Sequence, residues 1–104
     1  MVKFDEYVID TLMRDLVGHD RRPVSFLVYL WMGAEQQRRG KAVAISYNEL
    51  AESMGVSKSS AQASIGWLIR RKLLGVTKAS VTATPCYTVQ TPWKIDYRRT
   101  PGSR

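Results

Sequence analysis

The chain has 104 residues, of which 44% are hydrophobic and 24% charged, with a formal net charge of +7. This length fits one domain with a single small core. No apolar run approaches the roughly 20 residues that span a bilayer, and an N-terminus with Asp5, Glu6 and Asp10 does not resemble a signal peptide. The single cysteine, Cys86, cannot form an intramolecular disulfide. We therefore expect a soluble cytosolic protein that does not bind a membrane.

Two helices are predicted in the first 40 residues. From Asp5 to Val17, apolar residues recur at helical intervals, and the helix should end near Gly18. Pro23 suits the first turn of a second helix, which Gly40 should stop. The apolar residues of the first helix are Val8, Ile9, Leu12, Met13 and Leu16.

The second predicted helix is apolar nearly all round from Val24 to Met32. Such a helix should be central in the fold, because every face of it needs a packing partner. After Gly40, the residues from Val43 to Ile45 are expected to form a short strand.

Two short helices joined by a tight turn are predicted between Ser46 and Arg71. Ser46 and Glu49 have the spacing of a capping box at the start of the first of these helices. Gly55 suits a left-handed cap at its end, and Ser57 is a natural N-cap for the next helix, over about residues 57–71. A turn of about three residues between two helices is typical of a helix-turn-helix.

The second of these helices has two different faces. Ala61, Ile65 and Leu68 fall on one stripe that should face inward. The opposite face is small, polar and basic and has no carboxylate, which favours an approach to a DNA groove. That face consists of Lys58, Ser59, Gln62, Ala63 and Gly66.

A β-hairpin is predicted directly after this helix. Two β-branched stretches, about Leu74 to Val81 and Cys86 to Thr91, flank a turn that contains Thr84 and Pro85. The hairpin would place Lys78 in its first strand.

The segment LAESMGVSKSSAQASIGWLIRRKLL and the later strand TPCYTV, with Pro85, Tyr87 and Val89, carry a family resemblance. The chain resembles the bacterial winged helix-turn-helix DNA-binding proteins over about residues 23–92. The resemblance implies a mainly α fold with a small β-wing (α+β), in the order helix, helix, strand, helix, helix, β-hairpin. Two residues depart from the family pattern: Trp67 stands at a usually polar position, and Lys72 replaces the glycine that commonly ends the recognition helix.

We expect one winged-helix domain over residues 1–97 and a flexible basic tail over residues 98–104. Charge is distributed unevenly along this domain. Residues 1–20 contain two basic and five acidic residues, whereas residues 53–104 contain nine basic residues and one acid, Asp96. The predicted recognition helix and wing lie in the acid-free stretch 53–95, which favours a polyanionic partner. The dipole of the helix alone is an alternative explanation for Arg70, Arg71 and Lys72, which lie in its last turn.

The resulting expectation is sequence-specific binding of double-stranded DNA, with the recognition helix in the major groove. Gln62 is the best candidate for reading a base, because its amide can pair with adenine through two hydrogen bonds. The base-reading candidates are Lys58, Ser59, Ser60, Gln62 and Ala63. The candidates for contacts with the DNA backbone, including those from the wing, are Ser57, Arg70, Arg71, Lys72, Lys78, Ser80, Thr82 and Thr84.

A transcriptional regulator is the favoured role. The alternatives are a replication or partition accessory protein and a winged-helix module that binds another protein. A homodimer is expected, since one helix reads few base pairs. An exposed apolar patch could form its interface, and its candidate residues are Phe4, Tyr7, Ile9 and Trp67. For each of these residues, packing in the core is the alternative.

The sequence gives little support for catalysis. The only histidine, His19, is placed in a loop beside Asp20, and no second histidine or cysteine has the spacing of a metal ligand. No glycine-rich nucleotide loop is present. We therefore expect a non-enzymatic protein without a cofactor or metal, in the bacterial cytosol or nucleoid.

Overall fold

The computed structural model describes residues 1–93, so the boundary at residue 97 and the predicted tail lie outside the described residues. The described chain is mainly helical, with one small three-stranded antiparallel sheet. In chain order, the elements are η1 (Val8–Leu12), η2 (Arg14–His19), α1 (Pro23–Arg39), β1 (Val43–Ala44), α2 (Tyr47–Met54), α3 (Lys58–Arg70), β2 (Leu74–Thr77) and β3 (Cys86–Val89). None of the helices within residues 1–93 is long and apolar enough to cross a membrane.

The N-terminal helix differs from the prediction in its winding. It forms two π-helical segments, η1 and η2, in which the Met13 amide donates to the Val8 carbonyl and the Asp20 amide to the Asp15 carbonyl. The helix ends at His19, one residue after Gly18, so the expected end near Gly18 is confirmed. The loop position of His19 is wrong, because the bond from the Asp20 amide keeps His19 in the helix. Apolar spacing does not reveal the extra residue in each hydrogen-bonded turn.

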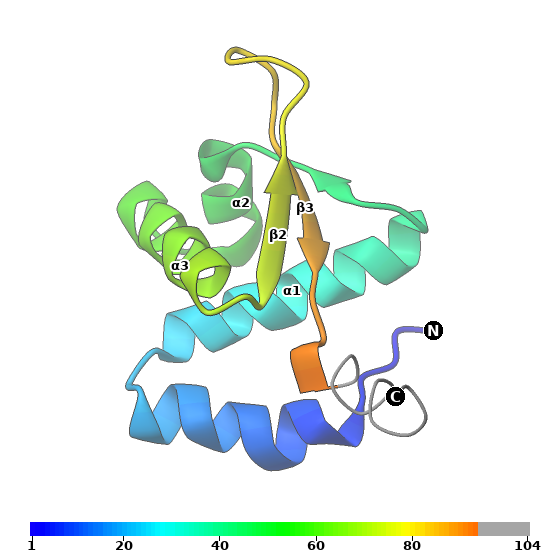
Figure 1. Cartoon of the computed structure of the whole chain (residues 1–104). Coiled ribbons are helices and arrows are strands. Elements are labelled where there is room, and N and C mark those ends of the chain that lie inside the picture. Colours follow the sequence, from blue (N-terminus) through cyan, green and yellow to red (C-terminus); the bar gives the residue numbers. More distant parts are fainter. Residues whose placement is uncertain (94–104) are drawn as a thin grey trace, which may run out of the picture.

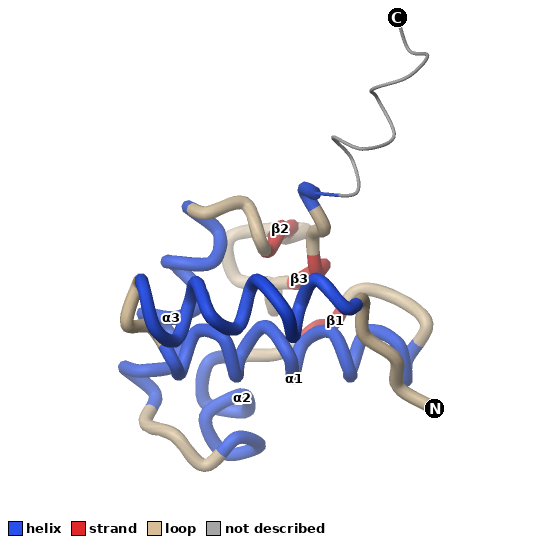
Figure 2. Tube along the Cα trace, turned by 90° about the horizontal axis from the view of Figure 1, so that it is seen from below, coloured by secondary structure: helices blue, strands red, loops and turns tan. Residues whose placement is uncertain are grey.

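Helix α1 is central, as its composition predicts. Figure 2 shows the N-terminal helix running along α1, which also packs against α3 and β3. Its side chains Phe26, Val28, Tyr29 and Met32 are buried, and it ends at Gly40 in a left-handed cap with φ of 70°. Burial raises the pKa of the Tyr29 hydroxyl, which donates to the Gln90 carbonyl at 2.9 Å. This bond ties α1 to the segment that follows β3.

The sheet has the order β1-β3-β2, so the short strand expected near Val43 pairs with the hairpin. Val43 lies opposite Tyr87, and Thr77 lies opposite Cys86. All three strands are shorter than predicted, since residues 45, 78–81 and 90–91 lie outside them. β-Branched residues alone do not extend a strand: Val81 is 90% exposed, and the connection over residues 78–85 gives it no paired neighbour.

The capping signals around α2 and α3 are confirmed. The Glu49 amide donates to Ser46 Oγ at 3.1 Å, and the Ser46 amide donates to Glu49 Oε1 at 3.0 Å, which completes the capping box. The bond from the Ser46 amide, and next the side chain of Ser46, lower the pKa of the Glu49 carboxyl. Gly55 adopts the left-handed conformation with φ of 75°, and Ser57 accepts a bond from the Ser60 amide at 3.0 Å. Local sequence therefore fixes both ends of the turn between α2 and α3.

Candidate nucleic-acid interface

Helix α3 has the two faces that its sequence predicts. Ala61, Ile65 and Leu68 are buried at 0–1% exposure and pack into the core. Lys58, Ser59, Gln62 and Ala63 are exposed on the other side, and Gly66 is half-buried beside them. These five residues are called the α3 outer face below. No long apolar or acidic side chain projects from them.

The start of α3 is held by its own serines. Ser57 Oγ accepts from the Ser60 amide and lies 3.2 Å from Ser59 Oγ. Ser60 itself is half-buried and turns toward the start of α1, where it lines a surface pocket. Of the three predicted contact serines, Ser57 and Ser59 are thus exposed at the helix start, whereas Ser60 lies at the edge of the face.

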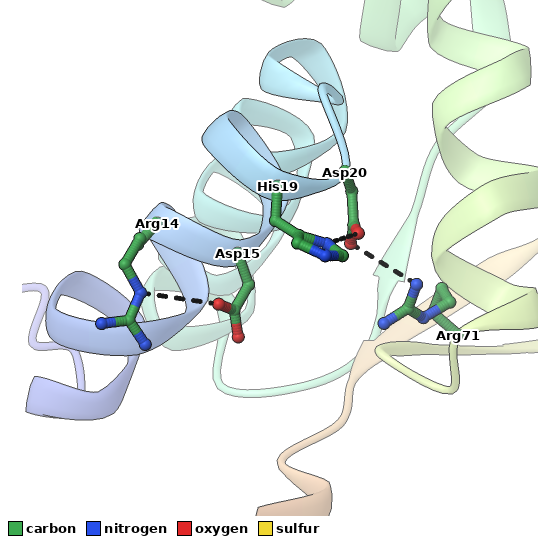
Figure 3. Close-up of polar contacts among 5 residues, drawn as sticks. All are labelled: Arg14, Asp15, His19, Asp20 and Arg71. Carbon is green, nitrogen blue, oxygen red and sulfur yellow. Dashed lines mark hydrogen bonds and ion pairs between the residues drawn. The ribbon is translucent and has the colours of Figure 1, made fainter.

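The three basic residues after α3 have different surroundings. Arg71 is held within the chain: its Nη1 lies 3.4 Å from Asp20 Oδ2, and its guanidinium lies 5.1 Å from the centre of the Trp67 ring. Figure 3 shows Arg71 extending toward Asp20, which also bonds His19 Nδ1 at 2.9 Å, beside the Arg14 and Asp15 pair. Arg70 and Lys72 are exposed and form no ion pair with any described residue.

Lys72 occupies the position at which a glycine is common. Its φ is 63°, and its amide bonds the Ile69 carbonyl at 3.0 Å while the Leu73 amide bonds the Leu68 carbonyl at 2.9 Å. This is the hydrogen-bond pattern of a Schellman motif, whose left-handed residue is usually glycine. Lys72 therefore adopts the conformation of the residue it replaces.

Lys72→Gly should raise the free energy of unfolding by about 1 kcal/mol, because glycine enters the left-handed region without a steric cost. Urea unfolding of the two proteins measures this difference. The control is Lys58→Gly in the first turn of α3, where glycine should destabilise. Equal stability losses in both variants would contradict the assigned conformation of Lys72.

Trp67 does not belong to an exposed apolar patch. It is 8% exposed, lies in the core, and has the guanidiniums of Arg22 and Arg71 over its ring. Tyr7 is half-buried and stacks on Trp93 at 4.3 Å. Tyr7 and Trp67 therefore pack inside the protein, as the alternative to an exposed patch predicted. Phe4 and Ile9 are exposed.

The wing candidates lie on one exposed loop. Lys78, Ser80, Thr82 and Thr84 are exposed within residues 78–85, and Ser80 Oγ lies 3.5 Å from Thr82 Oγ1. Figure 1 shows this loop projecting beyond the rest of the molecule from the end of the β2 and β3 hairpin. The structure thus places Lys78 on the loop, not in a strand as expected.

The positive charge of this part of the molecule is not neutralised by the acids described. Glu35 pairs with Arg38 at 2.7 Å and Arg39 at 3.1 Å on α1, and these arginines lower its pKa. Asp20 is the acid that reaches the end of α3. Within residues 1–93, Lys58 and Lys78 form no ion pair, so the α3 outer face and the loop retain their charge.

Two functional candidates were not predicted from the sequence. Arg21 and Arg22 lie at the start of α1 and line a pocket against Ser60 and Ala63 of α3. In the sequence they are visible as a pair of arginines directly before Pro23. This pair indicates a site only once α1 and α3 are known to pack together.

A scan against protein-family models gives no match, and neither the search of curated proteins nor that of solved structures gives one. Among the described residues, no three His, Cys, Asp or Glu side chains gather where they would hold a metal ion.

Proposed function

We propose that this chain is a winged helix-turn-helix protein that binds double-stranded DNA in a sequence-specific way. The observation that carries the proposal is the α3 outer face, an acid-free and largely exposed helix surface of small polar residues. Lys58 at its start pairs with no acid among residues 1–93. Helix α2, the Gly55 turn and α3 supply the helix-turn-helix, and the β2 and β3 hairpin with its loop supplies the wing. A regulator of transcription in the bacterial cytosol or nucleoid is the role that we favour.

The proposed reading of DNA follows from the side chains on the outer face. The N-terminal half of α3 enters the major groove, where the small residues Ser59 and Ala63 permit close approach. Gln62 can donate to and accept from an adenine edge, and Lys58 can reach a guanine or a phosphate. Ser57 at the helix start and the exposed Arg70 and Lys72 at its end contact the DNA backbone.

Arg71 has a different role in this proposal from that of its neighbours. Because its guanidinium is bonded to Asp20 and stacked on Trp67, a direct phosphate contact would compete with both interactions. We therefore assign the backbone contacts after α3 to Arg70 and Lys72, and we assign to Arg71 the positioning of α3 against the N-terminal helix.

Lys78→Ala tests the wing. The variant should bind every duplex more weakly, and the slope of log affinity against log salt should flatten by about one, because one phosphate contact is lost. The measurement is fluorescence anisotropy over a series of salt concentrations. The control is Lys41→Ala. Lys41 is exposed and precedes β1 at the end of the sheet away from the loop. The salt slope of this variant should therefore equal that of the wild type. The same slope for wild type and Lys78→Ala would remove the wing from the proposed interface.

We expect the protein to act as a homodimer. The N-terminal helix exposes Ile9, Met13 and Val17 at four-residue intervals, at 40–47% exposure, and Phe4 precedes them at 39%. A second copy is the partner we assign to this stripe, since two recognition helices read a longer site than one. Light scattering after gel filtration should give twice the chain mass of 11.8 kDa.

A further inference from the structure

A surface pocket lies between the start of α1 and the side of α3. Its volume is about 210 Å³. Residues 21–25 form one wall, and Ser60, Ala63 and Ser64 of α3 form the other. Ala63 also belongs to the α3 outer face, so the pocket borders the surface that we propose to contact DNA.

The first turn of α1 leaves backbone donors free at this pocket. The N-cap residue, Arg22, makes no side-chain capping bond, whereas Ser46 and Ser57 cap α2 and α3. Pro23 has no amide hydrogen, and the Phe26 amide is the first to enter the ladder, bonding the Arg22 carbonyl at 3.1 Å. The amides of Val24 and Ser25, which both line the pocket, remain as the orphan donors of the helix start.

Two buried hydroxyls independently indicate a ligand. Ser25 is 2% exposed and Ser64 is 4% exposed, and both line the pocket. Neither hydroxyl forms a hydrogen bond within residues 1–93. Neither is sealed from solvent, since the Trp93 indole nitrogen is the unpaired side-chain polar atom that is fully buried there. Each hydroxyl therefore reaches the surface, and an acceptor bound in the pocket that both residues line would satisfy it.

The charge around the pocket selects an anion. Arg21 and Arg22 are exposed at its rim, and no carboxylate lines it. The nearest acid along the chain, Asp20, is engaged by His19 and Arg71. Arg22 lies 5.4 Å from the centre of the Trp67 ring, which leaves Arg21 as the guanidinium without a partner among the described residues.

From these observations, we propose that the pocket is an oxyanion site that takes one phosphate group. The amides of Val24 and Ser25 and the hydroxyls of Ser25 and Ser64 donate to the phosphate oxygens, and Arg21 supplies the charge-assisted bond. This deepens the proposed function and rests on it for the source of the ligand: a phosphate of the DNA strand that flanks α3. A free phosphate ester has the same chemistry and is the other source.

The first experiment titrates inorganic phosphate into the full chain, with chloride at matched ionic strength as the reference, and follows the backbone amides by NMR. The Val24 and Ser25 amide signals should shift in a saturable way. Arg21→Gln should weaken the apparent phosphate affinity about tenfold, and Ser64→Ala should weaken it several-fold. Lys41→Gln removes the same charge beyond the other end of α1 and should leave the affinity unchanged.

The second experiment compares the same variants on a duplex by fluorescence anisotropy. If DNA is the source, Arg21→Gln flattens the salt slope by about one, and Lys41→Gln does not. Saturable phosphate binding without an effect of Arg21→Gln on the duplex supports the oxyanion site with a free phosphate ester as its ligand. Absence of any saturable shift at Val24 and Ser25, together with unchanged DNA binding by Arg21→Gln, overturns the site. Since wild-type binding to the duplex is measured alongside, failure of the site is distinguishable from failure of the DNA-binding function.

Discussion

Leu68→Ala should lower the free energy of unfolding by about 2 to 5 kcal/mol, the range for removing a fully buried leucine side chain. Leu68 is 0% exposed on the inner stripe of α3, together with Ala61 and Ile65. Its carbonyl also accepts the Leu73 amide bond that ends the helix. The cavity left by alanine would loosen the contact between α3 and α1, the contact that positions the outer face.

The control for this prediction is Leu27→Ala. Leu27 lies on α1 but is 50% exposed, so the same truncation should cost well under half as much. Urea unfolding monitored by tryptophan fluorescence gives both values. Similar losses for Leu27→Ala and Leu68→Ala would show that α3 does not present this face to the core.

Gln62→Ala should weaken binding to a preferred duplex by about 1 to 3 kcal/mol and leave binding to a scrambled duplex nearly unchanged. Gln62 is exposed at the centre of the α3 outer face, and its amide is the group there that can exchange two hydrogen bonds with one base. The preferred duplex is obtained by selecting wild-type protein on a random pool. Anisotropy on both duplexes then gives the two losses.

The matched control is Gln37→Ala. Gln37 is also exposed, but it lies on α1 and exchanges hydrogen bonds with the backbone of Lys3. This variant should bind both duplexes as the wild type does. Equal losses of affinity on the preferred and scrambled duplexes for Gln62→Ala would show that Gln62 contacts the DNA backbone. Its base-reading role would then be refuted.

The parts of the fold that depend on local chemistry are predictable from the sequence. Ser46 with Glu49, Gly55 and Ser57 define the ends of α2 and α3 through bonds between near neighbours, and all of these bonds form. Helical spacing likewise predicts which side of α3 is buried. The capping residues and the apolar stripe therefore contain enough information to place the helix-turn segment.

The parts that depend on distant partners are not predictable in this way. Arg71 meets Asp20 across 51 positions of the chain, and the guanidiniums of both Arg22 and Arg71 lie over the ring of Trp67. The pairing register of β2 and β3 determines where each strand ends. Strand propensity overestimates the length of both strands. The winding of the N-terminal helix differs from an α-helix only in its hydrogen bonds, which apolar spacing does not report.

The α3 outer face is proposed to read a DNA sequence. The most direct measurement is fluorescence anisotropy of the wild-type protein titrated into the duplex that flanks its own gene and into a scrambled duplex, each at low and near-physiological salt. If α3 reads DNA in this way, tight binding survives the higher salt only on the native duplex. Absence of binding to either duplex would contradict DNA binding and favour a protein-binding module. Equal, salt-sensitive binding to both would contradict sequence reading by α3.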